Sequence, residues 1–518
     1  MMKNKRSEQI VNLEEQEFDL LVIGGGATGA GIALDASLRG LKVALVDSGD
    51  FGSGSSGKST KLAHGGIRYL EKAIKEWDYT QLSLVKDALN ERKIFQKIAP
   101  HLSRVLPIAI PCYSWCDLIY YYLGIKIYEL LAWGKNLRKG QFLSKRKLKK
   151  FLPYVDRKSL KGGVLFYDGQ FDDVRMNIAI IMRAFTLGAV VANYVKVIGF
   201  KKQHGKISGA EVTDVLSGKV WNITSKVVVN ATGAQSDILR TLDDPNCETV
   251  ISGSIGSHII LDRGLTRCDM GMLIPKSTDD RVIFMLPWKE STLVGTTDIK
   301  ITAGVALHPS KEEIRYLIEH LNRYLDISIS AADIKSSWTG VRPLASQKGV
   351  AKTRALSRDY VIEVSTSGMF SIYGGKWTLY RKMAESLVDQ VMNHAKIPFV
   401  KSSTESQCLS GNDEELSIIL SEICESSQLD VDIIDHLVKT YGIDAKKVVD
   451  IAKKGYSNRL LKMYSYIEAE VVYAVEQEFA CSVDDILLRR VPIALHDQKA
   501  AEKVSEKILN LIKSSIKV

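Results

Sequence analysis

The sequence predicts an α/β protein: a Rossmann-like dinucleotide-binding domain, an α+β domain and a C-terminal all-helical domain. Three observations support this fold class. A glycine-rich turn follows an apolar run that begins at Phe18, several later apolar runs end in Gly, Thr or Asp, and the apolar spacing becomes helical from about Ser402 onward. With 518 residues, 45% of them hydrophobic, the chain is long enough for about three domains.

The first element is a βαβ unit between Phe18 and Asp47. Gly24, Gly26 and Gly29 form a G-x-G-x-x-G turn between an apolar run and a helical stretch of small residues. Such a turn places a pyrophosphate at the positive end of the helix. Asp47 ends the second apolar run, where an acidic side chain accepts hydrogen bonds from an adenosine ribose. The unit therefore predicts dinucleotide binding, and this motif leaves FAD and NAD both open.

Four further apolar runs are typical of buried strands that lead into loops at a sheet edge. They are residues 226–234, 281–288, 291–298 and 369–375. After the Ser/Thr-rich stretch 401–407, segments such as VDIIDHLVKTYG have apolar residues three and four positions apart. These spacings predict a separate helical domain over residues 402–518.

The positive charge of the chain is concentrated in one segment. The formal net charge is +10, and residues 135–150 contain eight basic and no acidic side chains. The preceding residues 118–133 are apolar and aromatic, with only Lys126 and Glu129 charged, and are too short to span a bilayer. Two interpretations are open: peripheral contact with an anionic membrane, or a buried helix followed by a solvated basic face.

The cysteines and the N-terminus give weaker indications. The seven cysteines do not form a disulfide framework, which favours a reducing compartment. Cys112 and Cys116 have no partners at zinc-like spacing, so we expect no metal. Residues 1–17 contain several acidic residues and make a poor transit peptide.

Longer motifs carry a resemblance to a known family. With IGGGATGAG followed by STKLAHGGIRYL, the chain resembles the FAD-dependent glycerol-3-phosphate dehydrogenases, and the mitochondrial branch most of all. Six other motifs recur in that family in the same order: residues 98–108, 166–179, 228–234, 338–344, 356–364 and 374–385. The resemblance extends from about Phe18 to the end of the chain.

The resemblance implies a reaction, partners and a division into domains. The reaction is the oxidation of glycerol 3-phosphate to dihydroxyacetone phosphate by hydride transfer to FAD, with electrons passed to a ubiquinone-type acceptor. The enzyme would be peripheral to the mitochondrial inner membrane or that of a related organelle, form a homodimer and bind no nucleic acid. The FAD-binding domain would be discontinuous (residues 18–105, 161–250 and 346–400), with a membrane-contacting insertion (106–160), a substrate-binding domain (251–345) and the helical domain (402–518).

Such a site needs cations for the substrate phosphate and a base for the hydroxyl proton. Arginine is suited to phosphate because its planar fork donates two parallel hydrogen bonds. Arg342 ranks first, with Arg68, Arg358 and Lys376 as further candidates from family motifs and Tyr69 as a residue that closes the pocket or binds substrate.

The candidate bases are His64 and His258, because histidine accepts a proton near neutral pH. His64 is preferred, since it lies four residues before Arg68 and a helical turn would place both on one face. His258 has an alternative as a hydrogen-bonded core residue. The Gly-Thr-Thr-Asp segment at 295–298 is interpreted as supporting structure.

The resemblance places further residues along the cofactor, and glycines among them permit close backbone approach. The full cofactor-binding set is Gly24, Gly26, Gly29, Asp47, Thr60, Lys61, His64, Gly65, Ala231, Gly233, Gly374, Gly375, Lys376, Trp377 and Thr378.

Three other functions remain open for this sequence. A glycerol-3-phosphate oxidase would use the same site with O2 and form H2O2. A flavin-containing RNA-binding protein would use the basic run to contact phosphate. An amino-acid oxidase-type reaction on the same fold is separated by a substrate panel.

Overall fold

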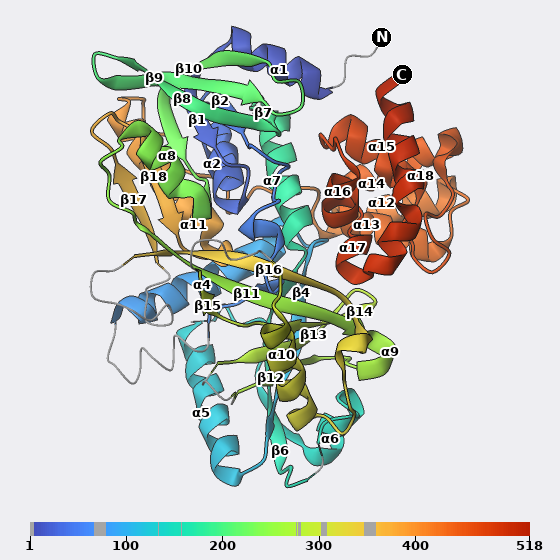
Figure 1. Cartoon of the computed structure of the whole chain (residues 1–518). Helices are drawn as coiled ribbons and strands as arrows, with labels where there is room; N and C mark the ends of the chain where they lie inside the picture. Colours follow the sequence, from blue (N-terminus) through green and yellow to red (C-terminus); the bar gives the residue numbers. More distant parts are fainter. Residues whose placement is uncertain are drawn as a thin grey trace.

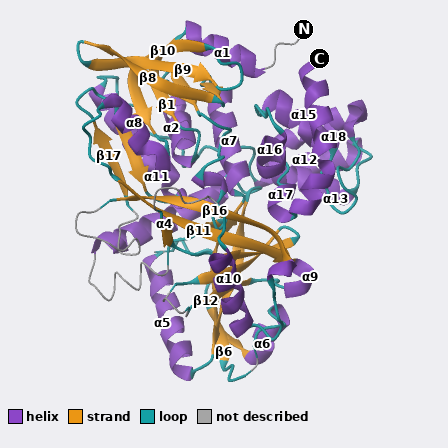
Figure 2. Ribbon diagram, viewed as in Figure 1, coloured by secondary structure: helices purple, strands orange, loops and turns teal. Residues whose placement is uncertain are grey.

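The computed structural model describes residues 5–66, 79–132, 134–156, 158–275, 277, 281–301, 308–346 and 359–517. Its three parts are visible in Figure 1: a sheet with helices in the upper part, a second sheet below it, and a cluster of helices on the right that contains the C-terminus. The helical cluster contains no strand labels, whereas both other parts mix strands and helices (Figure 2). The predicted α/β class with a C-terminal helical domain is confirmed.

The upper sheet has the parallel core expected of a dinucleotide-binding domain. Its strand order is β17-β18-β10-β1-β2-β7, and β1 runs parallel to both β10 and β2. β9 extends it by pairing with β10 and β8. The strands are β1 (Glu17–Ile23), β2 (Val43–Val46), β7 (Val190–Ala192), β8 (Val195–Gln203), β9 (Lys206–Asp214), β10 (Val220–Asn230), β17 (Tyr360–Val364) and β18 (Phe370–Gly374). The sheet is therefore assembled from strands in distant parts of the chain.

Small residues allow the helices of this domain to pack closely. A Cβ on Gly31 of α2 (Ala27–Leu38) would lie 2.8 Å from a ring carbon of Tyr380, the first residue of α11 (Tyr380–His394). The run of Ala and Gly in α2 therefore reflects helix contact as well as the turn before it. The remaining helices of the two α/β parts are α1 (Lys5–Glu15), α4 (Tyr79–Ile98), α5 (Trp115–Leu131), α6 (Lys145–Phe151), α7 (Asp173–Thr186), α8 (Ser236–Asp243), α9 (Arg263–Thr266) and α10 (Lys311–Tyr324).

The lower sheet contains ten strands. Its order is β15-β11-β14-β13-β12-β4-β6-β3, with β16 paired to β11 and β5 paired to β6. The strands are β3 (Leu62–Ala63), β4 (Ser103–Cys112), β5 (Gln141–Ser144), β6 (Gly162–Phe171), β11 (Ile251–Asp262), β12 (Gly271–Ile274), β13 (Ile283–Trp288), β14 (Ser291–Gly295), β15 (Ile299–Lys300) and β16 (Ile334–Ala345).

The strand pairing differs from the predicted domain ranges at β3 and β6. Residues 18–105 and 161–250 were assigned to the dinucleotide-binding domain, yet β3 and β6 pair with each other in the lower sheet. β6 is buried along almost its whole length. A strand buried on both faces has the same apolar pattern in either sheet, so the sequence does not reveal which sheet it joins.

The described residues of the C-terminal domain form helices joined by loops, and buried ion pairs hold the domain to the upper domain. Its helices are α12 (Asp413–Ser426), α13 (Val431–Tyr441), α14 (Ala445–Ile451), α15 (Glu468–Gln477), α16 (Val483–Asp485), α17 (Ile493–His496) and α18 (Gln498–Lys517). Arg489 and Arg490 both contact Asp50, and Arg175 binds Glu478 through two hydrogen bonds of 2.8 Å. Among the helices in the described part of the chain, none combines the length and apolar character needed to cross a bilayer.

Candidate functional site

The turn after β1 is so tight that side chains at two of its glycines would collide with backbone oxygen atoms. Gly24 has φ +111°, and a Cβ on it would lie 2.6 Å from the carbonyl oxygen of Ala231. A Cβ on Gly29 would lie 1.8 Å from the carbonyl oxygen of Gly24. The glycines thus allow a tight turn at the N-terminus of α2, a backbone arrangement that fits the pyrophosphate of a dinucleotide.

Asp47 directly follows β2 and lies beside this turn. Its Oδ2 accepts a hydrogen bond from the Gly25 amide at 2.6 Å, and its Oδ1 accepts one from the Gly49 amide at 2.9 Å. Burial raises the pKa of the Asp47 carboxyl to about 6, although the two amides oppose the shift. A carboxylate in this position is suited to accept the hydroxyl groups of a ribose.

Two further glycine-bearing turns lie at the same sheet edge. β10 runs parallel to β1 and β18, so the three strands end on one side of the sheet. Gly233, after β10, has φ +57°, and Gly374 and Gly375, at the end of β18, have φ +80° and +74°. A Cβ on Gly233 would lie 4.0 Å from Pro343 of β16. The predicted cofactor edge therefore faces the strand that carries Arg342.

Ser56, which was not predicted as a site residue, connects the start of α2 with the segment that follows β18. Ser56 Oγ accepts a hydrogen bond from the Ala27 amide at 2.9 Å, and the Ser56 carbonyl accepts one from the Trp377 indole at 2.9 Å. Trp377 packs edge-on against Phe95 and Phe171. The predicted residues Lys376 and Trp377 are half-buried and Thr378 is buried. The Gly/Ser-rich stretch 51–59 was the available signal for Ser56.

His258 lies in β11, directly opposite Trp338 of β16. Its ring stacks on that indole with 5.5 Å between the ring centroids, and its Nε2 lies 2.9 Å from Thr60 Oγ1. Among the described residues, its buried Nδ1 has no hydrogen-bond partner. Burial lowers the pKa of His258 to about 3, and the positive charges of Arg342 and Lys61 add to the shift. His258 is therefore neutral near pH 7.

Arg342 is held in a defined orientation by several oxygen atoms, including the Ile255 carbonyl at 3.3 Å. Its Nη2 donates to Thr296 Oγ1 at 2.9 Å and to the Thr297 carbonyl at 3.0 Å. Its ion pair with Asp298 is longer, at 3.4 Å, and both side chains are partly exposed. The segment 295–298, interpreted from the sequence as supporting structure, thus orients the candidate phosphate-binding arginine.

Lys61 differs from an ordinary ligand-binding lysine. It is fully buried, with φ +60°, and its Nζ donates to Asp173 and to the Gly57 carbonyl. The same nitrogen lies 5.3 Å from the ring centre of Trp288 and 5.5 Å from that of Trp338. The Lys61 charge therefore lies against the rings of Trp288 and Trp338, and His258 stacks on the second of these rings.

The predicted residues around His64 are described only in part. His64 follows β3 and is half-buried, and the Gly65 amide donates to the hydroxyl of Tyr128 at 2.9 Å. Arg68, Tyr69 and Arg358 lie outside the described residues. The structure thus brings Thr60, His258 and Arg342 together and leaves the predicted pairing of His64 with Arg68 untested. Within the described residues there is no cluster of three metal-ligating side chains.

Comparisons with known proteins are consistent along the whole chain. Residues 19–381 match the family model of FAD dependent oxidoreductases, and residues 402–518 match that of the C-terminal domain of alpha-glycerophosphate oxidase. The chain is 40% identical to the mitochondrial glycerol-3-phosphate dehydrogenase of Rattus norvegicus, over 98% of this chain and 72% of the rat protein. It is 37% identical to a probable glycerol-3-phosphate dehydrogenase of Encephalitozoon cuniculi, over 98% of this chain and 83% of that protein.

A solved structure agrees with these matches. The glycerol-3-phosphate dehydrogenase of Bacillus halodurans, complexed with FAD, superposes with a TM-score of 0.81 and 28% identity. The superposition covers 99% of this chain and 94% of the other.

Proposed function

The chain belongs to the family of FAD-dependent glycerol-3-phosphate dehydrogenases, and from this premise we propose which of its residues perform the reaction and where its electrons go. The enzyme oxidises glycerol 3-phosphate to dihydroxyacetone phosphate with FAD as cofactor. Bound FAD supplies the acceptor for the hydride that leaves C2. The remaining tasks, binding the phosphate and accepting the hydroxyl proton, belong to side chains of this chain.

Arg342 binds the substrate phosphate in this proposal. The observation that carries it is the orientation of its guanidinium by Thr296 and Thr297 beside the edge formed by the three glycine turns. Asp298, at 3.4 Å, is a loose partner that a dianionic phosphate can replace. Lys376 follows Gly375 at that edge, and Arg68, Tyr69 and Arg358 complete the binding set by their positions in family motifs.

The two histidines have different roles in this proposal. A general base works best when its pKa lies near the operating pH, and the pKa of His258 is about 3. We therefore keep His64 as the proposed base that takes the proton from the C2 hydroxyl. Neutral His258, held by Thr60, serves as a hydrogen-bonding residue that orients this hydroxyl.

Anaerobic titration with glycerol 3-phosphate, followed by loss of the yellow absorbance, tests these roles. Arg342→Ala is expected to raise the substrate concentration needed for half reduction, because the phosphate loses a charged partner. His64→Ala is expected to slow reduction at saturating substrate by at least about 100-fold, the lower end of what a general base typically contributes. Arg315→Ala, at an exposed position of α10, is the control. Unchanged behaviour of both site variants would refute the assignment.

We propose that the electrons go to a quinone in the membrane and that α5 docks the protein there. Five side chains on one face of α5 are between 39% and 71% exposed, since their spacing of three and four residues places them together. They are Trp115, Ile119, Leu123, Ile127 and Leu130. The opposite face buries Leu118, Ile125 and Tyr128. The helix is thus attached to the domain by one face and presents an apolar surface with the other.

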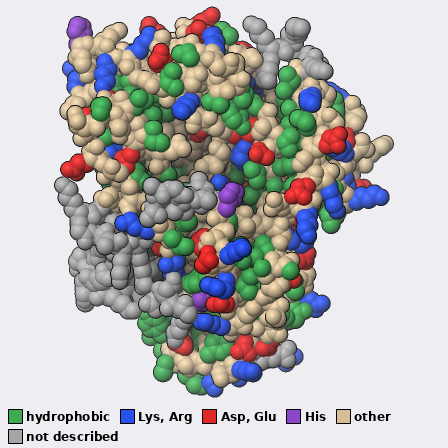
Figure 3. Space-filling view, in the orientation of Figure 1, with side chains coloured by type: hydrophobic (Ala, Val, Ile, Leu, Met, Phe, Trp, Pro, Cys, Tyr) green, Lys and Arg blue, Asp and Glu red, His purple; other side chains and the backbone are tan. Residues whose placement is uncertain are grey.

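Basic residues lie close to this apolar surface in the chain. α6 begins with exposed Lys145, Arg146 and Lys147, which suits contact with anionic headgroups. At the lower end of the molecule, basic and apolar side chains occur together with acidic ones on the face seen in Figure 3. We propose a peripheral location on the mitochondrial inner membrane or that of a related organelle.

Sedimentation with phosphatidylglycerol-containing vesicles tests this docking. Leu123→Ser combined with Leu130→Ser is expected to abolish binding, and added salt to weaken it, because both apolar burial and charge contribute. The control is Ile418→Ser, an equally exposed apolar residue of α12. Equal binding by the double variant and the control would remove α5 as the docking element.

The oxidase alternative has one finding in its favour. Residues 402–518 match the C-terminal domain of alpha-glycerophosphate oxidase. An oxidase consumes oxygen and forms stoichiometric H2O2 at full rate without added quinone. We expect slow oxygen consumption that is accelerated by a quinone analogue, and full-rate peroxide formation would overturn the quinone assignment.

A further inference from the structure

Three buried polar side chains from separate elements meet beside the segment that carries His64. They are Arg92 of α4, Tyr128 of α5 and Asp168 of β6. Arg92 donates to Asp168 at 2.5 Å, and the Tyr128 hydroxyl donates to the same carboxylate at 3.3 Å and 3.4 Å to its two oxygens. The Arg92 guanidinium lies 5.8 Å from the Tyr128 ring centre. Each member is therefore held by the other two.

The charges of this trio are balanced internally. Burial raises the pKa of the Asp168 carboxyl, and Arg92 opposes that shift. Burial also raises the pKa of the Tyr128 hydroxyl, which keeps it protonated and able to donate to Asp168. A hydroxyl that donates to a carboxylate still has lone pairs with which it can accept a hydrogen bond.

That acceptor is used by the backbone next to His64. The Gly65 amide donates to the Tyr128 hydroxyl at 2.9 Å. A Cβ on Gly65 would lie 2.7 Å from this oxygen and 2.7 Å from Leu89 of α4, so the glycine lies tightly against both helices. Because Tyr128 is fixed by Asp168 and Arg92, the position of Gly65 is fixed as well.

We propose that Tyr128, locked by Asp168 and Arg92, is a positioning residue that sets the place of the His64 side chain through the Gly65 backbone. This inference rests on the proposed role of His64. The inference gives a role to three buried polar residues that are not among the proposed substrate-binding or cofactor-binding residues: Tyr128 near the end of α5, Arg92 in α4 and Asp168 in β6. Tyr128 acts through the backbone and does not touch the reacting atoms.

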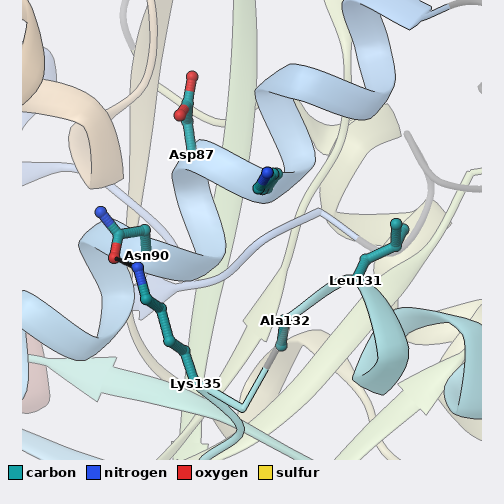
Figure 4. A pocket seen from close by; sticks show the side chains of 6 residues that line it. Asp87, Asn90, Leu131, Ala132 and Lys135 are labelled. Carbon is teal, nitrogen blue, oxygen red and sulfur yellow. Dashed lines mark hydrogen bonds between the residues drawn. The ribbon is translucent and has the colours of Figure 1, made fainter.

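The packing between α4 and α5 makes this polar contact important. Val85 and Leu89 of α4 form a small cluster with Tyr128 and Ala132. Next to it lies a pocket of about 240 Å³, lined by residues 86, 87 and 90 of α4 and by residues 131, 132 and 135, with Lys135 bonded to Asn90 across it (Figure 4). The apolar cluster holds Tyr128 against α4, and its hydroxyl then connects both helices to the His64 segment through the Gly65 amide.

Tyr128→Phe in the FAD-loaded protein tests the inference with two measurements. Hydrogen exchange at the Gly65 amide, resolved by fragmentation in mass spectrometry, is expected to become at least about tenfold faster, because the amide loses its acceptor. Anaerobic reduction by saturating glycerol 3-phosphate is expected to slow about tenfold per bound flavin, with little change in the half-saturating concentration. Asp168→Asn, which keeps the hydroxyl but loosens its hold, is expected to give a smaller effect of the same kind.

Tyr120→Phe is the matched control, because it removes a hydroxyl from an exposed tyrosine of the same helix. Equal reduction rates per flavin in the two Phe variants, or unchanged exchange at Gly65, would overturn the inference. A loss of bound FAD with a normal rate per remaining flavin would overturn it too, since that result indicates a structural role only. A wild type that glycerol 3-phosphate fails to reduce would instead refute the proposed function.

Discussion

Thr60 Oγ1 lies 2.9 Å from His258 Nε2, and this contact joins the segment after the glycine turn to the β11/β16 strand pair of the lower sheet. The contact fixes which nitrogen of the ring is engaged. His258 is neutral and stacked on Trp338, so the threonine is the described polar group that sets its orientation.

Two substitutions of Thr60 distinguish the effect of its hydroxyl group from the effect of its side-chain volume. Thr60→Val keeps the volume and removes the hydrogen bond, so we expect kcat to fall about tenfold, the cost of about 1.4 kcal/mol in orientation. Thr60→Ser is expected to retain most of the activity. Steady-state kinetics with an artificial electron acceptor measure both, and equal kcat values for the two variants would show that the contact has no role in turnover.

Buried neutral histidines make stability depend on pH. Burial lowers the pKa of His101 to about 4 and that of His258 to about 3, and it also lowers the pKa of His496 well below its usual value. The unfolded chain binds a proton at each of these groups below about pH 6.5, whereas the folded protein does not. Stability is therefore present above that pH and is lost as the pH falls toward the folded pKa values.

The contribution of His258 can be measured as a change in the slope of the unfolding free energy against pH. His258→Asn is expected to reduce the dependence of the free energy of unfolding on pH by about 1.4 kcal/mol per pH unit between pH 4 and pH 6. Denaturant unfolding at a series of pH values gives this slope. His204→Asn, at an exposed position, should match the wild type. Parallel slopes for His258→Asn and wild type would contradict the burial of a neutral imidazole.

The sequence predicted the nucleotide-binding unit well because all its signals are local. Between Phe18 and Asp47 the apolar runs, the glycines and the terminal acid lie within one βαβ unit, and the structure contains each part. Propensity, pattern and turn chemistry agree there, so few other folds compete.

Contacts between distant segments could not be predicted in the same way. Thr60 and His258 are 198 residues apart, and no local pattern in the sequence relates them. β6 (Gly162–Phe171) was not among the predicted strands, and its pairing with β3, β4 and β5 depends on contacts far along the chain. The serine at position 56 bonds to Trp377 across 321 residues, which no local period could indicate. Arg342 was predicted from its motif and the segment 295–298 as supporting structure, but the sequence did not show that Thr296 and Thr297 bind Arg342.

Asp47 predicts a pH dependence of FAD affinity. Without cofactor its pKa is about 6, because burial disfavours the charged form. Ribose hydroxyls that donate to the carboxylate favour the ionised form, so the pKa is lower in the complex. Affinity should therefore rise as the pH increases through about 6 and level off above it.

Titration of the apoprotein with FAD, followed by flavin fluorescence, measures this dependence. Asp47→Asn is expected to bind more weakly and to lose the change near pH 6. Glu17→Gln, at the exposed start of β1, is the control. A wild-type affinity that is constant from pH 5 to pH 7 would rule out titration of Asp47 on binding.

The ion pairs of Asp50 predict that the helical domain stabilises the adenosine end of the cofactor site. Asp50 is fully buried, and although burial raises its pKa, Arg490 and Arg489 hold the pKa below its usual range. Its Oδ1 also accepts from Asn193 at 2.9 Å. Asp50→Asn would leave the buried Arg490 without its main counter-charge, which we expect to cost about 3–5 kcal/mol in the free energy of unfolding.

The matched comparison is an exposed ion pair. Asp435→Asn breaks the surface pair with Lys439 and is expected to cost less than about 1 kcal/mol. Denaturant unfolding compares the two variants, and limited proteolysis shows whether the helical domain separates first. Because Asp50 lies three residues after Asp47, the variant should also bind FAD more weakly at pH 7. If Asp50→Asn were no more destabilising than Asp435→Asn, the buried network would not be what holds the two domains together.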